Sequence, residues 1–321
     1  MNSFYLGIDV GGTYVRFAVY DDFYGSITDV KKVLFHKSGN PKEEVDDNLC
    51  KMISTIVMEK KHENKELKGI GLALAALFDR ESGAITIWPN NQVWNEFPIR
   101  EYLRRRFNVP IIMEEDANAG ALGEYLAGAG KKSENMAYIT VGTGIGCGLI
   151  INKKLYIGTN GWAGEIGHIK VVKEGAPCNC GKRGCLQSIV SGPGLLKSFI
   201  EMKREKHQLY DSSLNLKEVA DLANNGDTEA GEVFTSAGKY IGQMISGMVR
   251  LLDISLVVVG GGVMKVGDLL LNPIISAVDL DLKGFDREVR VEKSQLGDNS
   301  AVIGAINLIL KYANHIKILQ N

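Results

Sequence analysis

Residues 4–20 read FYLGIDVGGTYVRFAVY. Two apolar runs joined by a Gly-Gly-Thr turn are typical of a β-hairpin, and the pattern predicts strands over Phe4–Val10 and Val15–Tyr20. Residues 136–152 read MAYITVGTGIGCGLIIN and repeat this order, with strands expected over 136–141 and 149–152 around a glycine-rich turn. Such an internal repeat indicates two lobes built on one plan.

The remaining sequence alternates apolar strands with amphipathic helices, which predicts an α/β fold. Helices are expected over 42–62, 99–107, 117–129, 192–206, 215–224, 227–252 and 300–312, and further strands over 69–78, 85–88, 109–113, 256–259 and 289–293. Because 321 residues exceed one ordinary domain, we expect two lobes. The small N-terminal lobe is expected over residues 1–119 plus a C-terminal helix at about 300–321, and the large lobe over 120–299.

Composition and charge exclude several classes of protein. Lys and Arg number 37 against 38 Asp and Glu, so the net charge of −1 offers no electrostatic surface for nucleic acid or an anionic membrane. The longest apolar run, Gly69–Phe78, is too short to span a bilayer. Asp9 interrupts the first apolar run, so we expect no signal peptide and a cytoplasmic protein.

Glycine-rich turns follow three of the expected strands, at residues 11–13, 142–146 and 260–262. Such turns expose backbone N–H groups that accept phosphate oxygens, and a Thr hydroxyl adds a donor. The candidate phosphate contacts are Gly11, Gly12, Thr13, Gly142, Thr143, Gly144, Gly261 and Gly262. One such turn alone is more often only a turn, but three at strand ends favour a nucleotide. Neither a Walker loop nor the dinucleotide fingerprint is present.

Acidic residues stand beside these turns and after a later strand. Asp9 lies just before the first turn and is a candidate Mg²⁺ ligand, directly or through water; the alternative is that it caps its own turn. Glu114, Glu115 and Asp116 end one strand and open a helix, where acids are often solvated. Asp116 is our candidate general base for a sugar hydroxyl that attacks a γ-phosphoryl group. Glu165 is a second acid, suited to binding sugar hydroxyls.

Three of the five cysteines lie in the loop CNCGKRGC at residues 178–185. Cys178, Cys180 and Cys185 together with the upstream His168 form a closed set of zinc ligands, and the alternative is three incidental thiols. Cys50 is expected in a helix core, and Cys147 is expected in the second glycine turn without a chemical role.

These motifs together resemble the ROK family of sugar kinases and repressors. The matching stretches are residues 6–13, 115–118, 142–146, 164–168, 178–185 and 258–263, in the family's order. The resemblance implies a two-lobed actin-like, ribonuclease-H-like ATPase fold with ATP and sugar in a cleft, and commonly a homodimer. It implies that Asp116 is the catalytic base. It further implies that Asn90, Glu115, Glu165, His168 and Gln187 bind sugar, and that His168 also binds a structural zinc with its other ring nitrogen.

Three positions depart from the family pattern. Glu115 stands where glucokinases of the family usually have Asn, Gln187 where they have Glu, and residues 73–76 replace a Pro-Gly-Pro. The first two exchanges swap hydrogen-bond donors and acceptors at positions that, by the resemblance, read sugar hydroxyls. We therefore expect phosphorylation of a hexose, at its 6-hydroxyl, with allose, glucose, mannose or fructose as candidates and a hexose other than glucose favoured. N-acetylmannosamine is the alternative substrate.

Two functions of other classes remain as alternatives. A sugar-responsive transcriptional regulator of the same family needs a DNA-binding module before the first turn, and only Met1, Asn2 and Ser3 precede the first expected strand. A non-catalytic sugar-binding protein would leave the three phosphate-type turns without a purpose. We therefore expect an enzyme whose partners are ATP with Mg²⁺ and a small sugar, without nucleic acid or membrane.

Overall fold

The computed structural model describes residues 2–89, 91–207, 213–285 and 288–320. The chain divides into two compact units, residues 1–127 with 299–321 and residues 128–298. The chain therefore leaves the first unit after helix α4 (Asp116–Ala127) and returns just before helix α10 (Ser300–Gln320). The expected lobe boundary after residue 119 lies inside α4.

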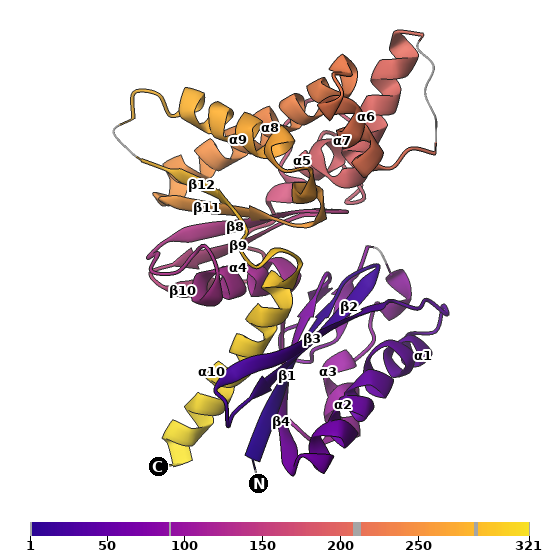
Figure 1. Ribbon diagram of the computed structural model, residues 1–321, viewed down its shortest axis with the longest axis vertical. Coiled ribbons are helices and arrows are strands. Elements are labelled where there is room, and N and C mark those ends of the chain that lie inside the picture. The colour runs from indigo at the N-terminus through magenta and orange to yellow at the C-terminus, as the bar shows by residue number, and fades with distance from the viewer. Residues whose placement is uncertain (1, 90, 208–212, 286–287, 321) are drawn as a thin grey trace. The chain divides into compact units, whose positions relative to one another are not determined.

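The first unit is built on a five-stranded sheet in the order β3-β2-β1-β4-β7. Its strands are β1 (Asn2–Val10), β2 (Tyr14–Asp21), β3 (Ser26–Leu34), β4 (Lys65–Leu74) and β7 (Ile111–Glu115). β1, β2 and β3 pair antiparallel, whereas β4 and β7 continue the sheet in parallel. Figure 1 shows α10 on one side of this sheet and α1 (Pro41–Val45), α2 (Lys51–His62) and α3 (Ile99–Phe107) on the other.

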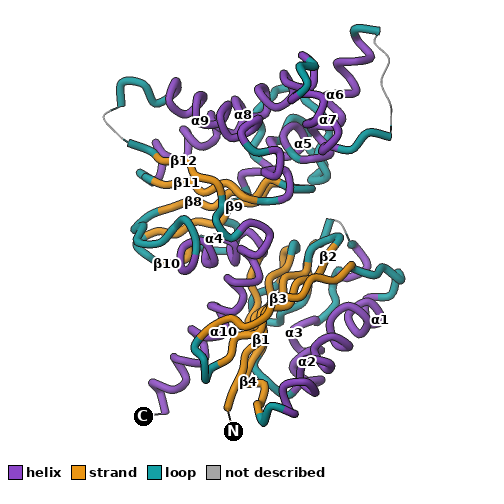
Figure 2. The backbone as a smooth tube through the Cα atoms, viewed as in Figure 1, coloured by secondary structure: helices purple, strands orange, loops and turns teal. Residues whose placement is uncertain are grey.

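The second unit repeats this plan with the strand order β10-β9-β8-β11-β12. Its strands are β8 (Met136–Val141), β9 (Ile145–Ile151), β10 (Lys154–Tyr156), β11 (Leu256–Gly260) and β12 (Arg290–Lys293). Its helices are α5 (Leu186–Val190), α6 (Gly192–Glu205), α7 (Leu216–Asn224), α8 (Thr228–Leu252) and α9 (Asp268–Asp281), and Figure 2 shows them stacked over one face of the sheet. The internal duplication predicted from the two hairpins is confirmed, since both sheets pair antiparallel and then parallel in the same sequence.

The structure corrects several of the expected elements. The second return strand begins at Ile145 rather than at residue 149, so the glycine turn is only Gly142–Gly144, and Cys147 is a buried strand residue. The run 69–78 divides into β4 and the short β5 (Leu77–Phe78), which pairs with β6 (Ile85–Ile87). β3 and α9 were not expected from the sequence: β3 is an edge strand with mostly exposed residues, and α9 contains Pro273.

Short helical turns complete the fold. A π-helical turn, Asp46–Cys50, joins α1 to α2 and buries Cys50, as expected for a core position. In the described part of the chain, 3₁₀ turns lie at Gln92–Trp94, Ile166–His168, Gly262–Val266 and Gly297–Asn299. Within the described residues, no helix is both long and apolar enough to span a membrane.

Helix α10 packs unusually close to its neighbours in the first unit because glycine lines the contacts. A Cβ placed on Gly71 of β4 would lie 1.8 Å from the carbonyl oxygen of Ala305, and a Cβ on Gly304 would lie 1.7 Å from that of Ala119 in α4. Both distances lie far below van der Waals contact, so only glycine permits this approach. The C-terminal helix is therefore an integral part of the first unit.

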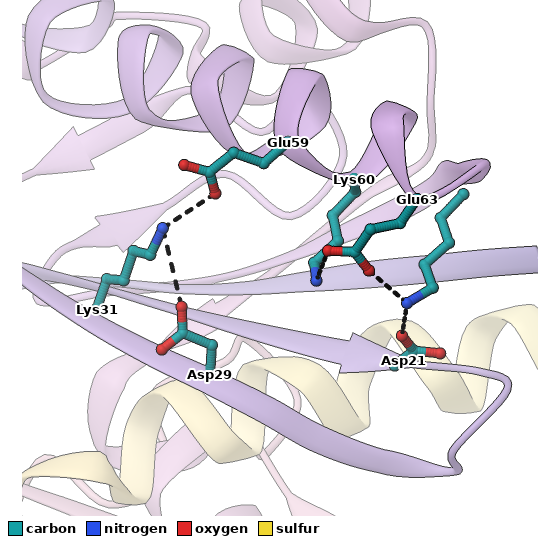
Figure 3. Close-up of polar contacts among 7 residues, drawn as sticks. Asp21, Asp29, Lys31, Glu59, Lys60 and Glu63 are labelled. Carbon is teal, nitrogen blue, oxygen red and sulfur yellow. Dashed lines mark hydrogen bonds and ion pairs between the residues drawn. The ribbon is translucent and has the colours of Figure 1, made fainter.

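Ion pairs connect α2 to β3 and the start of β4 to the end of β2 (Figure 3). Lys31 on β3 contacts Glu59 on α2 at 3.1 Å, and Lys65 contacts the buried Asp21 at 2.6 Å. Lys65 also contacts Glu63, and these two carboxylates together raise the pKa of the Lys65 amine. The exposed pairs add little stability, whereas Lys65 neutralises a fully buried acid at the end of β2.

A buried carboxylate organises the segment that precedes α3. Glu44 is almost fully buried and accepts hydrogen bonds from the Asn91 amide (2.6 Å) and the Trp94 indole (2.7 Å). It also accepts the backbone N–H groups of Ser38 and Gly39. Burial alone would raise the pKa of Glu44, but these four donors outweigh it and hold the pKa below its usual value.

We expect Glu44→Gln to lower the free energy of unfolding by about 2 kcal/mol at neutral pH, because an amide cannot satisfy the same four donors. A carboxyl group whose pKa is lower in the folded than in the unfolded state stabilises the protein at pH values above its unfolded-state pKa. That contribution is lost as the pH falls through the folded-state pKa. The difference between wild type and variant should therefore shrink below about pH 4, in urea unfolding followed across pH. The exposed neighbour Glu43 provides the control Glu43→Gln, and equal stability of all three proteins at neutral pH would contradict this role of Glu44.

Candidate active site

The first glycine turn joins β1 to β2 and has Asp9 and Arg16 beside it. The Gly11 N–H donates to the Tyr14 carbonyl at 3.0 Å, which closes the turn. Among the described residues, the N–H groups of Gly12 and Thr13 have no recorded acceptor, and Thr13 is exposed. Asp9 is buried and pairs with Arg16, its cross-strand neighbour, at 3.2 Å between Oδ2 and Nη1. The turn thus presents two N–H donors next to a neutralised acid.

The second turn, Gly142–Gly144, occupies the matching place between β8 and β9. The Gly142 N–H donates to the Gly144 carbonyl at 2.9 Å, and the Gly142 carbonyl accepts the Gly192 N–H at 2.8 Å. Thr143 is exposed, and no acceptor is recorded for the N–H groups of Thr143 and Gly144 among the described residues. Both hairpins of the duplicated fold therefore carry a closed Gly/Thr turn with two N–H groups that have no acceptor among the described residues.

The third turn lies against the second. Gly261 has φ of 92°, and a Cβ there would lie 2.4 Å from the Val141 carbonyl oxygen, so only glycine fits. Gly262 opens the 3₁₀ turn that follows. A pocket of about 260 Å³ opens beside these residues, and it is lined by Val259, Gly260, Gly261, Met264, Lys265, Lys293, Ser294, Gly297 and Asp298. The second unit thus combines two glycine turns and a pocket at the ends of β8 and β11.

The three consecutive acids have different surroundings. Glu114 is buried and accepts a bidentate pair from Arg80 at 2.7 and 3.0 Å. Its Oε1 also accepts the Asn118 amide at 3.1 Å and the Glu115 N–H at 3.0 Å. Glu114 is therefore a structural acid that fixes the junction of β7 and α4. No local sequence pattern points to Arg80, because its partner lies 34 residues along the chain.

Glu115 and Asp116 follow at the start of α4. Glu115 is half-buried, with its Oε1 3.9 Å from Arg80 Nη2. Asp116 is the first residue of α4, and its Oδ1 accepts the Ala117 N–H at 2.8 Å. A carboxylate at a helix N-terminus is favoured in its ionised form, which is the form that accepts a proton.

The four predicted metal ligands come together in one cluster. The ligand atoms of His168, Cys178, Cys180 and Cys185 all lie within 4.8 Å of one another. His168 Nδ1 lies 3.6 Å from Cys178 Sγ, and Cys180 Sγ lies 3.7 Å from Cys185 Sγ. A tetrahedral zinc with Zn–S bonds of about 2.3 Å requires sulfur separations of about 3.8 Å. The donor set and its spacing therefore fit zinc.

Glu165 stands behind the histidine of this cluster. Its Oε2 lies 3.7 Å from His168 Nε2, the ring nitrogen that faces away from the cysteines. Burial raises the pKa of Glu165, and the nearby His168 partly offsets this effect. At 3.7 Å this carboxylate lies beside the ring nitrogen but beyond hydrogen-bond distance.

Gln187 is the second residue of α5, and this helix begins directly after Cys185, the last cysteine of the loop. Its side-chain Oε1 accepts the Ile145 N–H at 3.1 Å, which links α5 to the start of β9. The remaining predicted sugar contact, Asn90, lies outside the described residues.

We expect the purified protein to carry about one zinc per chain, as measured by metal analysis after dialysis. Chelation should then make the thiols of Cys178, Cys180 and Cys185 titratable with a thiol reagent. Cys50 and Cys147 should stay unreactive while the protein is folded, because burial raises the pKa of each thiol to about 12. Folded, metal-free protein in which the three loop thiols react freely from the start would contradict the zinc assignment.

Comparisons with known proteins agree with this geometry. The model of the ROK family matches residues 5–312, and the chain therefore belongs to the ROK family. It is 35% identical to a glucokinase of Halalkalibacterium halodurans over 98% of each protein. It is 29% identical to the xylose repressor of Bacillus subtilis, over 96% of this chain and 77% of the repressor.

Solved structures give the same result. A ROK family glucokinase from Streptomyces griseus in complex with glucose and AMPPNP is 30% identical, with a TM-score of 0.81 and coverage of 95% of this chain and 98% of that one. A ROK hexokinase from Thermus thermophilus is 26% identical with a TM-score of 0.81, over 97% of this chain and 99% of that one. These matches, with two sheets of equivalent strand order, confirm the expected actin-like ATPase fold.

Proposed function

We propose that this protein is an ATP-dependent sugar kinase that phosphorylates a hexose, at its 6-hydroxyl. The observation that carries the proposal is the matched pair of Gly/Thr turns, each at the same place in a duplicated sheet and each with two N–H groups that have no acceptor among the described residues. Backbone N–H groups in such turns bind phosphate oxygens. The glucokinase relatives and the glucokinase structure with glucose and AMPPNP support the same reading.

The nucleotide is assigned to all three turns. Gly11, Gly12 and Thr13 of the first unit, and Gly142, Thr143 and Gly144 of the second, donate to phosphate oxygens. Gly261 lines the pocket of about 260 Å³, and Gly262 follows it in the chain; we assign this pocket to the rest of the nucleotide. Asp9 would hold Mg²⁺ directly or through water, and Arg16, which pairs with Asp9, would be a second countercharge beside the turn. When bound, Mg²⁺ neutralises charge on the phosphates.

Asp116 is assigned as the general base. Its carboxylate accepts the proton of the sugar hydroxyl as that oxygen forms a bond to the γ-phosphorus. The bond from the γ-phosphorus to the bridging oxygen breaks, ADP leaves with the electron pair, and the proton stays on Asp116. The structural role of Glu114 supports this assignment, because a pair with Arg80 occupies that acid.

The sugar is assigned to Asn90, Glu115, Glu165, His168 and Gln187. Glu115 replaces the Asn that is usual in family glucokinases, and Gln187 replaces their usual Glu. The pattern of hydrogen-bond donors and acceptors around the sugar therefore differs. Each unpaired buried group costs about 1–3 kcal/mol, enough to change preference ten- to a hundredfold. We therefore favour a hexose other than glucose, with N-acetylmannosamine as the alternative. A zinc held by His168 and the three cysteines would fix the segment from Glu165 to Gln187, which carries three of these groups.

The test is ATP consumption by zinc-loaded protein with Mg²⁺ and a panel of hexoses and N-acetylhexosamines. Strong turnover of one sugar with weaker glucose turnover is the expected result. Flat baselines for every sugar, together with tight sugar binding on the same sample, would favour a non-catalytic binder. A sugar-dependent shift of duplex DNA without turnover would favour a regulator, the class of the xylose repressor relatives.

A further inference from the structure

The side chain of Gln187 links the cysteine loop to the second glycine turn. Its Oε1 accepts the Ile145 N–H at 3.1 Å, and Ile145 directly follows the turn Gly142–Gly144. Because a backbone N–H requires an acceptor, this contact fixes which end of the amide faces the turn. The Nε2 group of Gln187 forms no hydrogen bond among the described residues, so the amide's donor end is available for another contact.

The contact is close enough to shape the turn itself. A Cβ placed on Gly144 would lie 2.8 Å from Gln187 Oε1, so glycine is needed for the amide to reach Ile145. The turn is closed internally by the Gly142 N–H bond to Gly144, and the Gly192 N–H holds the Gly142 carbonyl. Gln187 thus holds the end of the turn that leads into β9, while the start of α6 holds the other end.

The chemistry of the amide suits a phosphate site. A carboxylate at residue 187 would accept the same N–H bond but would place a negative charge beside N–H groups that receive phosphate. A glutamine gives the hydrogen bond without the charge. Gln187 lies two residues after the fully buried Cys185, so its contact with Ile145 also connects the turn to the cysteine loop.

We propose that Gln187 is a positioning residue for the phosphate turn at 142–144, in addition to any sugar contact through Nε2. This inference rests on the proposed function, because it takes the turn to bind phosphate. It predicts that Gln187 affects the binding of nucleotide when no sugar is present. A residue that served only the sugar would leave that affinity unchanged.

The experiment measures the dissociation constant of AMPPNP with Mg²⁺ by calorimetry, on full-length zinc-loaded protein without sugar. We expect Gln187→Leu to weaken binding about tenfold, because the Ile145 N–H loses its acceptor and the turn loses its brace. Ser188→Ala is the matched control: Ser188 Oγ donates to the Cys185 carbonyl at 2.8 Å, with the Ala176 carbonyl at 3.2 Å, and among the described residues no hydrogen bond joins it to the turn. Its affinity for AMPPNP should equal that of wild type.

A second variant keeps the test independent of folding. Gln187→Glu retains the acceptor, so its zinc content and thermal unfolding should match wild type, while its AMPPNP affinity should fall and partly recover in high salt. AMPPNP affinities of both variants equal to wild type would overturn the inference. The affinity of the wild-type protein is measured first. If the wild-type protein binds no AMPPNP, the proposed function itself is contradicted.

Discussion

Asp116→Asn is expected to lower turnover about a thousandfold, within the range that general-base catalysis contributes. Asparagine has nearly the same size as aspartate, and its Oδ1 can still accept the Ala117 N–H, so the start of α4 should be unchanged. Its amide cannot accept the proton of the sugar hydroxyl. The loss should therefore appear in kcat, with little change in the dissociation constant for the sugar.

The control for this variant is Glu115→Gln at the preceding residue, which should change KM for the sugar more than kcat. Initial rates of ADP formation at saturating ATP, with sugar titrated for each protein, separate the two parameters. If Asp116→Asn keeps more than about a tenth of the wild-type kcat, Asp116 is not the base.

Arg80→Leu is expected to lower the free energy of unfolding by about 3 kcal/mol. The substitution removes both hydrogen bonds that Arg80 makes to Glu114 and leaves a carboxylate in a buried position without its countercharge. Arg80 is partly exposed, which keeps the cost below that of a fully buried pair. Urea unfolding followed by circular dichroism measures the change.

The double variant Arg80→Leu with Glu114→Gln separates the charge from the lost packing. Because the neutral amide needs no countercharge, the double variant should recover most of the stability that the single variant loses. Stability of Arg80→Leu within about 0.5 kcal/mol of wild type would show that Arg80 does not hold the junction of β7 and α4.

Much of the fold could be predicted from the sequence because the signals are local. The hairpin over residues 4–20 and its repeat over 136–152 each combine apolar strands with a Gly/Thr turn, and the structure forms both hairpins. The run Ile99–Phe107 forms a helix with the predicted bounds because its apolar residues lie on one face. β3 escaped prediction because it lies at a sheet edge and exposes most of its side chains.

The site divides in the same way between local and distant contacts. The cluster of His168 with the cysteines was predictable, since ligand type and short spacing define a metal site. The pairing of Glu114 with Arg80 and the contact of Gln187 with Ile145 were not, because each joins residues far apart in sequence. Both contacts arise from strand order and helix placement, which residue patterns do not encode locally.

Direct detection of phosphoryl transfer tests whether the protein moves the γ-phosphoryl group of ATP to a sugar. ATP labelled at the γ-phosphate is incubated with zinc-loaded protein, Mg²⁺ and each sugar in turn, and the products are identified by mass spectrometry. We expect a labelled hexose 6-phosphate in equal amount to ADP, and we expect Asp116→Asn to lose this product. If the folded, zinc-loaded protein binds AMPPNP and yet transfers no label to any hexose or to N-acetylmannosamine, the protein is not the sugar kinase proposed.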